Sequence, residues 1–168
     1  MDSSTTRYLT CAGHRLVALL GLLLSLLGCT KETIPNTYVE DTKANREVIE
    51  FVEKYRVAVE KRDVGALIDM ASHNYFDDMG TPGGDDDIDY AGLKSGLAQL
   101  RQELLAARYQ ISYRGLSYAA NNRVLVDVLY TGWFRVETAD GAQWRRRLEP
   151  HRLVLAREGT EFKILSGM

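Results

Sequence analysis

The chain has 168 residues, and its 21 lysines and arginines are balanced by 23 aspartates and glutamates, for a net charge of −2. This balance excludes the strong basic excess that is typical of nucleic-acid-binding proteins, so we expect no nucleic acid partner. The two cysteines, Cys11 and Cys29, and the three histidines show no metal-ligand spacing. We therefore predict no metal site and no cofactor.

An apolar run at residues 16–27 follows the charged residues Arg7 and Arg15 and stops just before Cys29. The run is shorter than the roughly 20 residues that cross a bilayer as a helix, so it indicates a signal peptide. Residues 26–29, Leu-Leu-Gly-Cys, have the form of a lipobox. We expect residues 1–28 to be cleaved and Cys29 to be lipidated. The alternative is an ordinary secretory signal whose cysteine is accidental.

A lipidated Cys29 predicts a bacterial lipoprotein that acyl chains hold at a membrane surface facing the periplasm. Thr30 follows the cysteine, and its resemblance to enterobacterial sorting signals implies the outer membrane. Residues 29–43 are polar, contain Pro35 and show no apolar period, which predicts a lipidated cysteine followed by a flexible tether. Residues 44–168 are enough for one domain with a hydrophobic core.

The domain begins with a helical pattern. Apolar residues recur at helical spacing over residues 45–62, and Asp63 is placed to cap a second, short helix. A loop rich in glycine and aspartate follows at residues 80–89. Asp89 then caps a third helix, in which Leu93, Leu97, Leu100 and Leu104 continue a stripe that begins at Tyr90.

From Tyr109 onward the apolar period changes to two, which predicts β-strands. The strands cover residues 109–113, 123–131, 143–157 and 162–165, and turn residues separate each from the next. Short turns of this kind join antiparallel strands. Three helices followed by an antiparallel sheet predict an α+β fold in which the helices cover one face of the sheet.

Two stretches carry a family resemblance. Residues 55–68 include the end of the first helix, an Arg-Asp corner and the second helix, and residues 150–164 form the last hairpin. Both resemble the NTF2-like superfamily, which includes ketosteroid isomerases, SnoaL-type polyketide cyclases, scytalone dehydratase and non-catalytic members. The resemblance implies a cone-like fold over residues 44–168, with three N-terminal helices packed on a curved antiparallel sheet.

The resemblance also implies candidate site residues. Tyr55 has the offset from Asp63 of the isomerase tyrosine that donates to an enolate oxygen, and Asp77 and Asp78 lie near the position of the general base. His151 stands where the isomerases have a protonated aspartate. The alternatives are a tyrosine packed in the core, a solvated pair of aspartates, and a histidine whose hydrogen bonds are satisfied at the sheet surface.

Trp133 and Trp144 are candidates to line the mouth of a pocket, or else only cover the core. On the strand at residues 123–131, Leu125 and Leu129 face away from the inward-facing valines, so both faces of the sheet are partly apolar. One face is expected to take a partner, either a second copy or an envelope protein.

Three functions are compatible with these patterns. The leading hypothesis is a non-catalytic lipoprotein that binds a small apolar ligand or docks an envelope protein partner. The second is a cofactor-independent isomerase, cyclase or dehydratase that uses Tyr55, Asp78 and His151 for proton transfer. The third is a structural envelope component with a filled cone.

Overall fold

The computed structural model describes residues 31–168, so the predicted signal peptide and Cys29 lie outside the described residues. Residues 32–168 fold as one compact unit. No helix in this described part of the chain is long and apolar enough to cross a membrane.

Within residues 31–168, three helices precede the large sheet, and the two predicted N-caps are confirmed. Asp63 accepts a hydrogen bond from the Ala66 amide, and Asp89 accepts one from the Gly92 amide, so each carboxylate satisfies a free N–H of the first helical turn. Arg62 adopts a left-handed conformation between the first two helices and turns the chain there. The helices are α2 (Lys43–Lys61), α3 (Val64–Met70) and α4 (Tyr90–Glu103).

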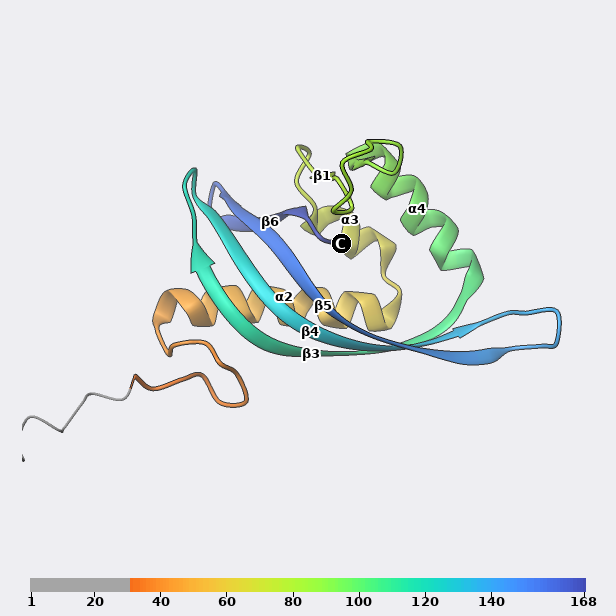
Figure 1. Ribbon diagram of the computed structural model, residues 1–168, viewed down its shortest axis with the longest axis horizontal. Coiled ribbons are helices and arrows are strands. Elements are labelled where there is room, and N and C mark those ends of the chain that lie inside the picture. Colours follow the sequence, from red (N-terminus) through yellow and green to blue (C-terminus); the bar gives the residue numbers. More distant parts are fainter. Residues whose placement is uncertain (1–30) are drawn as a thin grey trace, which may run out of the picture. The chain divides into compact units, whose positions relative to one another are not determined.

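The sheet is antiparallel, with the strand order β3-β4-β5-β6, as the α+β prediction requires. Its strands bend around α2, which lies across one face of the sheet (Figure 1). The short strands β1 (Phe76–Asp77) and β2 (Ile88–Asp89) pair separately. The large sheet consists of β3 (Leu104–Tyr118), β4 (Arg123–Val136), β5 (Gln143–Glu158) and β6 (Glu161–Ser166).

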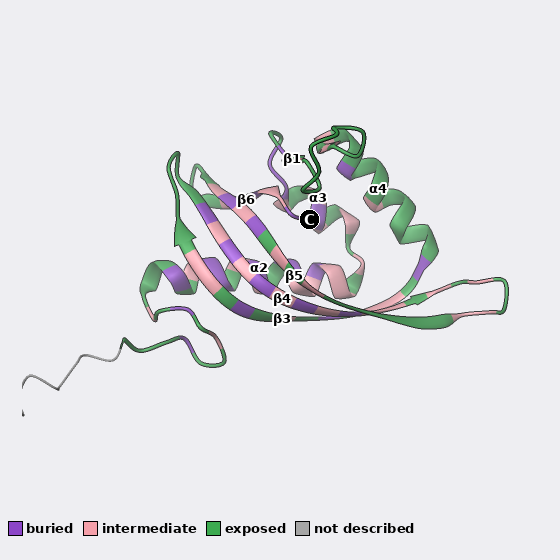
Figure 2. Ribbon diagram, viewed as in Figure 1, coloured by how far each residue is buried: buried purple, intermediate pink, exposed green. Residues whose placement is uncertain are grey.

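The core lies between α2 and the inner face of the sheet. Val48 and Val52 of α2 are fully buried, as are Val126 and Leu155 on the strands opposite them. Along β4, buried residues alternate with half-buried ones, as expected for a strand with one face on the core (Figure 2). Full burial of each such side chain contributes about 1.5–3 kcal/mol to folding.

The predicted apolar stripe of the third helix is wrong near its end. Leu93 is buried and Leu97 is half-buried, but Leu100 is 49% exposed. Leu104 is buried as the first residue of β3 and not as part of the helix. The last turn of α4 therefore carries its leucine into solvent while the chain turns back toward the sheet.

The predicted tether at residues 29–43 is wrong from Thr33 onward. Thr33 pairs with Glu40 around a turn, and the Tyr38 amide donates to the carbonyl oxygen of Tyr113 on β3 at 3.2 Å. Ile34 and Val39 are buried in the main core. Two apolar side chains and one main-chain hydrogen bond therefore fix this segment on the domain.

Replacing Val39, which is 2% exposed, with alanine tests whether this segment belongs to the fold. We expect Val39→Ala to lower the free energy of unfolding by about 2 kcal/mol, because two buried methyl groups are lost and a cavity remains. Urea denaturation measures the change. Tyr38→Ala, at a neighbouring position that is 71% exposed, is the control and should cost far less. Equal stability of Val39→Ala and the parent chain would restore the tether prediction.

Candidate functional site

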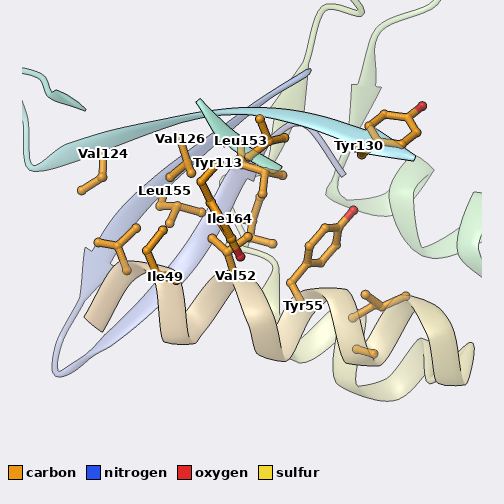
Figure 3. Close-up of a cluster of buried hydrophobic side chains, with 14 of the residues drawn as sticks. Ile49, Val52, Tyr55, Tyr113, Val124, Val126, Tyr130, Leu153, Leu155 and Ile164 are labelled. Carbon is orange, nitrogen blue, oxygen red and sulfur yellow. The ribbon is translucent and has the colours of Figure 1, made fainter. Parts of the chain in front are cut away.

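Three tyrosines lie against one another at one end of the core. Tyr55 extends from α2, and Tyr109 and Tyr130 face it from β3 and β4. The ring centroids of Tyr55 and Tyr109 are 6.4 Å apart, and those of Tyr109 and Tyr130 are 5.2 Å apart. Figure 3 shows Tyr55 extending from the helix toward the sheet, with Tyr130 on the strand above it.

Burial keeps these hydroxyls protonated. Desolvation raises the pKa of Tyr55 and of Tyr109 well above the usual value, and the Tyr109 hydroxyl opposes part of the shift at Tyr55 by hydrogen bonding. The pKa of Tyr113 is raised by burial and by its hydrogen bond to Glu53, whose Oε1 accepts at 2.7 Å. At neutral pH this part of the core offers hydrogen-bond donors and no tyrosinate base.

Asp77 and His151 meet at the same backbone segment. The Gly167 amide donates to Oδ2 of Asp77 at 2.7 Å, and Nε2 of His151 lies 2.7 Å from the Gly167 carbonyl oxygen. The His151 ring also packs edge-on against Tyr130, with the centroids 5.7 Å apart. Tyr55 thus connects to His151 through the stacked tyrosines, and His151 connects to Asp77 through Gly167.

Sequence reasoning missed Tyr75. Its hydroxyl donates to Oδ2 of Asp77 at 3.3 Å and accepts from the Met168 amide at 3.1 Å. Burial raises the pKa of Tyr75 to about 12, and Tyr75 lies close enough to raise the pKa of Tyr55 electrostatically. An available signal was its position two residues before Asp77, which places both side chains on one side of an extended chain.

The polar groups of this neighbourhood are occupied by the chain itself. Oδ1 of Asp77 accepts from the Met79 amide at 3.0 Å, while Oδ2 accepts from the Gly167 amide and the Tyr75 hydroxyl. Asp78 lies apart from this neighbourhood, because it is exposed and its Oδ1 accepts from the Gly80 amide. The structure therefore brings Tyr55, Asp77 and His151 into one neighbourhood and leaves Asp78 on the loop.

The two tryptophans line a hollow on the outer face of the sheet. Trp133 and Trp144 surround it together with Arg108 and Gln110, and Glu60 reaches it from α2 at the β3 edge. The volume of the hollow is about 420 Å³. The Arg108 guanidinium lies 5.5 Å from the Trp144 ring centroid. This hollow is separate from the tyrosine neighbourhood on the inner face.

A second groove, which sequence reasoning did not predict, lies between α2, α3 and the β5–β6 hairpin. Its volume is about 470 Å³, and Phe51, Met70 and Phe162 contribute apolar surface. The Phe51 and Phe162 rings are 5.8 Å apart, and Arg157 stacks 4.4 Å above Phe162. The other lining residues are polar or charged: Glu47, Glu50, Lys54, Asp69, Thr160, Glu161 and Lys163.

Two of the cations at this groove are already held. Arg157 Nη2 pairs with Oε2 of Glu47 at 2.8 Å, and Lys163 Nζ donates to the Asp69 carbonyl oxygen at 2.6 Å. Within residues 31–168, no ion pair is formed by Lys54, which projects from α2 on the exposed rim. The groove thus combines an aromatic floor with a cation available to a ligand. Its sequence signal was Phe51 in the helical stripe and Phe162 in the last strand.

Comparison with solved structures identifies the fold. A protein of Xanthomonas campestris assigned as a calcium/calmodulin dependent protein kinase II association domain aligns with a TM-score of 0.58 at 14% identity, over 84% of this chain and 94% of that one. Aln2 of a Streptomyces species aligns with a TM-score of 0.58 at 14% identity, over 77% and 91% of the two chains. A designed NTF2 protein aligns with a TM-score of 0.50 at 15% identity, over 74% and 97%.

No family model matches the sequence, and no curated protein matches it either. The structural likeness shows that residues 32–168 have the NTF2-like cone fold, with three helices on a curved antiparallel sheet. Because one fold hosts many chemistries, the likeness assigns no activity.

Gly167 is the point at which Asp77 and His151 meet, and substitution tests how tightly that contact is built. Its φ is +88°, and a Cβ there would lie 2.2 Å from the Arg152 carbonyl oxygen. We expect Gly167→Ala to lower the free energy of unfolding by at least about 2 kcal/mol more than Gly159→Ala. Gly159 is the matched control, because its φ is also positive but nothing lies within 4 Å of its Cβ. Chemical denaturation of both variants measures the difference, and equal costs would contradict the tight contact.

Proposed function

We propose that this NTF2-like domain is a lipid-anchored binding module that faces the periplasm and takes a small, largely apolar ligand in the groove between α2 and β6. The observation that carries the binding role is the floor of that groove, where Phe51 and Phe162 lie with their rings 5.8 Å apart. Ligand sites of this size are usually lined by apolar surface with a few polar groups that fix orientation. Lys54 at the rim favours a ligand with an anionic group.

The groove is better supported than the cone interior as the binding place. Stacked tyrosines occupy that end of the core, and Gly167 engages Oδ2 of Asp77 and Nε2 of His151. The proton-transfer hypothesis has less support, because Asp78 caps an exposed turn and both carboxylate oxygens of Asp77, the other candidate base, already accept hydrogen bonds from the chain. A non-catalytic binding role requires no such convergence.

The proposed anchor depends on the sequence before the described residues. A short apolar leader that ends in Leu-Leu-Gly-Cys at residues 26–29 supports acylation of Cys29. Several acyl chains on one residue give lasting attachment to a bilayer. Thr30 supports the outer membrane as the destination. A second copy or an envelope protein is the alternative occupant of the outer face of the sheet, where Trp144 and Leu148 are exposed.

Mass spectrometry of the protein purified from bacterial membranes tests the anchor. We expect a mature chain that begins at Cys29 and carries acyl groups, and we expect Cys29→Ser to abolish labelling by radioactive fatty acid. Cys11→Ser is the matched control and should leave both results unchanged, because Cys11 precedes the apolar run. An unmodified N-terminus at any other residue would contradict lipidation.

Photolabelling with a generic aromatic acid tests the groove. The probe is a benzoate that carries a diazirine, and we expect its covalent label on Phe51, Met70 and Phe162. Lys54→Glu should reduce labelling by roughly fivefold, since an exposed ion pair is worth up to about 1 kcal/mol. Lys94→Glu on α4 is the control for charge and should not change it. Label concentrated on Tyr55 and Tyr109 would place binding in the cone and overturn the groove.

A further inference from the structure

Five cationic and aromatic side chains gather on the outer face of the sheet, away from α2. The strand register places Arg108, Trp133 and Arg146 side by side across β3, β4 and β5, and places Arg135 beside Trp144 in the next row. On β3 and β4 the alternating residues Tyr109, Gly132 and Phe134 lie on the side of the core, so by strand register all five side chains point outward. On β5 the alternating residues Arg145 and Arg147 are exposed as well. We call these five residues the basic-aromatic face.

The arginines of this face are electrostatically uncompensated. Within residues 31–168, Arg108, Arg135 and Arg146 form no ion pair. Glu60 is the carboxylate that lines the adjoining hollow, but its Oε1 accepts from the Tyr109 amide and its Oε2 pairs with Arg56 at 2.7 Å. The face therefore presents three guanidinium groups that are available to anions.

The aromatic residues of the face are partly open to solvent. Trp144 is 49% exposed, and Leu148, next to the face on β5, is 51% exposed. Arg108 stacks on Trp144 and Arg146 stacks on Trp133, with 5.5 Å and 5.8 Å from guanidinium carbon to ring centroid. Tryptophan and arginine together favour the boundary between water and lipid, because each combines an apolar body with a polar end.

We infer that the basic-aromatic face rests on the surface of an anionic phospholipid bilayer, with the guanidinium groups on lipid phosphates and the indoles among the headgroups. The inference rests on the proposed anchor at Cys29 and adds which face of the domain meets the membrane. Charge complementarity favours this occupant over a second copy, because two such faces would bring six arginines together.

Tryptophan fluorescence tests the inference directly, because Trp133 and Trp144 are the two tryptophans of the chain and both lie in the face. The full chain is purified from bacterial membranes and reconstituted in vesicles of phosphatidylcholine, with or without phosphatidylglycerol. In vesicles with phosphatidylglycerol we expect blue-shifted emission and quenching by lipids with brominated chains. High salt should reverse both effects, because it screens the guanidinium–phosphate attraction.

The matched variants separate the face from overall charge. The triple variant Arg108→Gln, Arg135→Gln, Arg146→Gln should lower the quenching to its level in neutral vesicles while the protein stays on the membrane. Removing three exposed cations from the helices, by Lys43→Gln, Lys94→Gln and Arg101→Gln, should leave the quenching unchanged. The comparison of lipids in the parent chain needs no variant, so it holds even if the triple variant fails to fold.

Each outcome decides the inference separately from the anchor. Mass spectrometry of the same preparation reports acylation of Cys29, so tryptophan quenching in an unlipidated chain would support the face and refute the anchor. In a lipidated chain, tryptophans that remain accessible to aqueous iodide in anionic vesicles would overturn the inference. An equal emission shift caused by inorganic phosphate alone would overturn the inference as well. So would a blue shift that is already present in detergent, before vesicles are added, and accompanies formation of a dimer.

Discussion

The packing of α2 against the inner face of the bent sheet is the constraint on which the other features depend. Val48 and Val52 meet Val126 and Leu155 without exposed surface, and this contact fixes which side of every long strand faces inward. The inner side then gathers the tyrosines, and the outer side carries both tryptophans together with Arg108, Arg135 and Arg146. The proposed ligand groove borders this core through Phe51, Met70 and Phe162, whereas the proposed contact surface lies on the opposite face of the sheet.

Much of the fold was predictable because its signals are local. The caps at Asp63 and Asp89 each require one side chain and an amide three residues later, and the period of two after Tyr109 depends only on neighbours in the chain. The segment at residues 33–42 was not predictable in this way. Ile34 and Val39 show no period. Burial in the core holds them, together with the hydrogen bond from the Tyr38 amide to Tyr113, about 75 residues away in sequence.

The site was predictable only as a neighbourhood. The resemblance placed Tyr55, Asp77 and His151 in one region. It did not reveal that Gly167 contacts the latter two, since this contact forms only when the chain returns along β6. Trp133 and Trp144 were expected near a pocket, but the alternation of side chains along the strands did not show which face of the sheet contains the hollow. The groove was not predictable, because Phe51 lies on α2 and Phe162 on β6. Only the folded topology brings these two elements together.

The mixed hydropathy of β4 has a consequence for how the sheet chooses its pairing. Val126 faces inward and Leu125 outward, so a slip by one residue would still bury aliphatic side chains, and burial alone discriminates weakly against it. Asp127 and Arg152, directly opposed across β4 and β5 and 2.7 Å apart, would lose each other in a slipped sheet. This ion pair therefore favours the native register of β4 and β5, and its main effect is on the uniqueness of the fold.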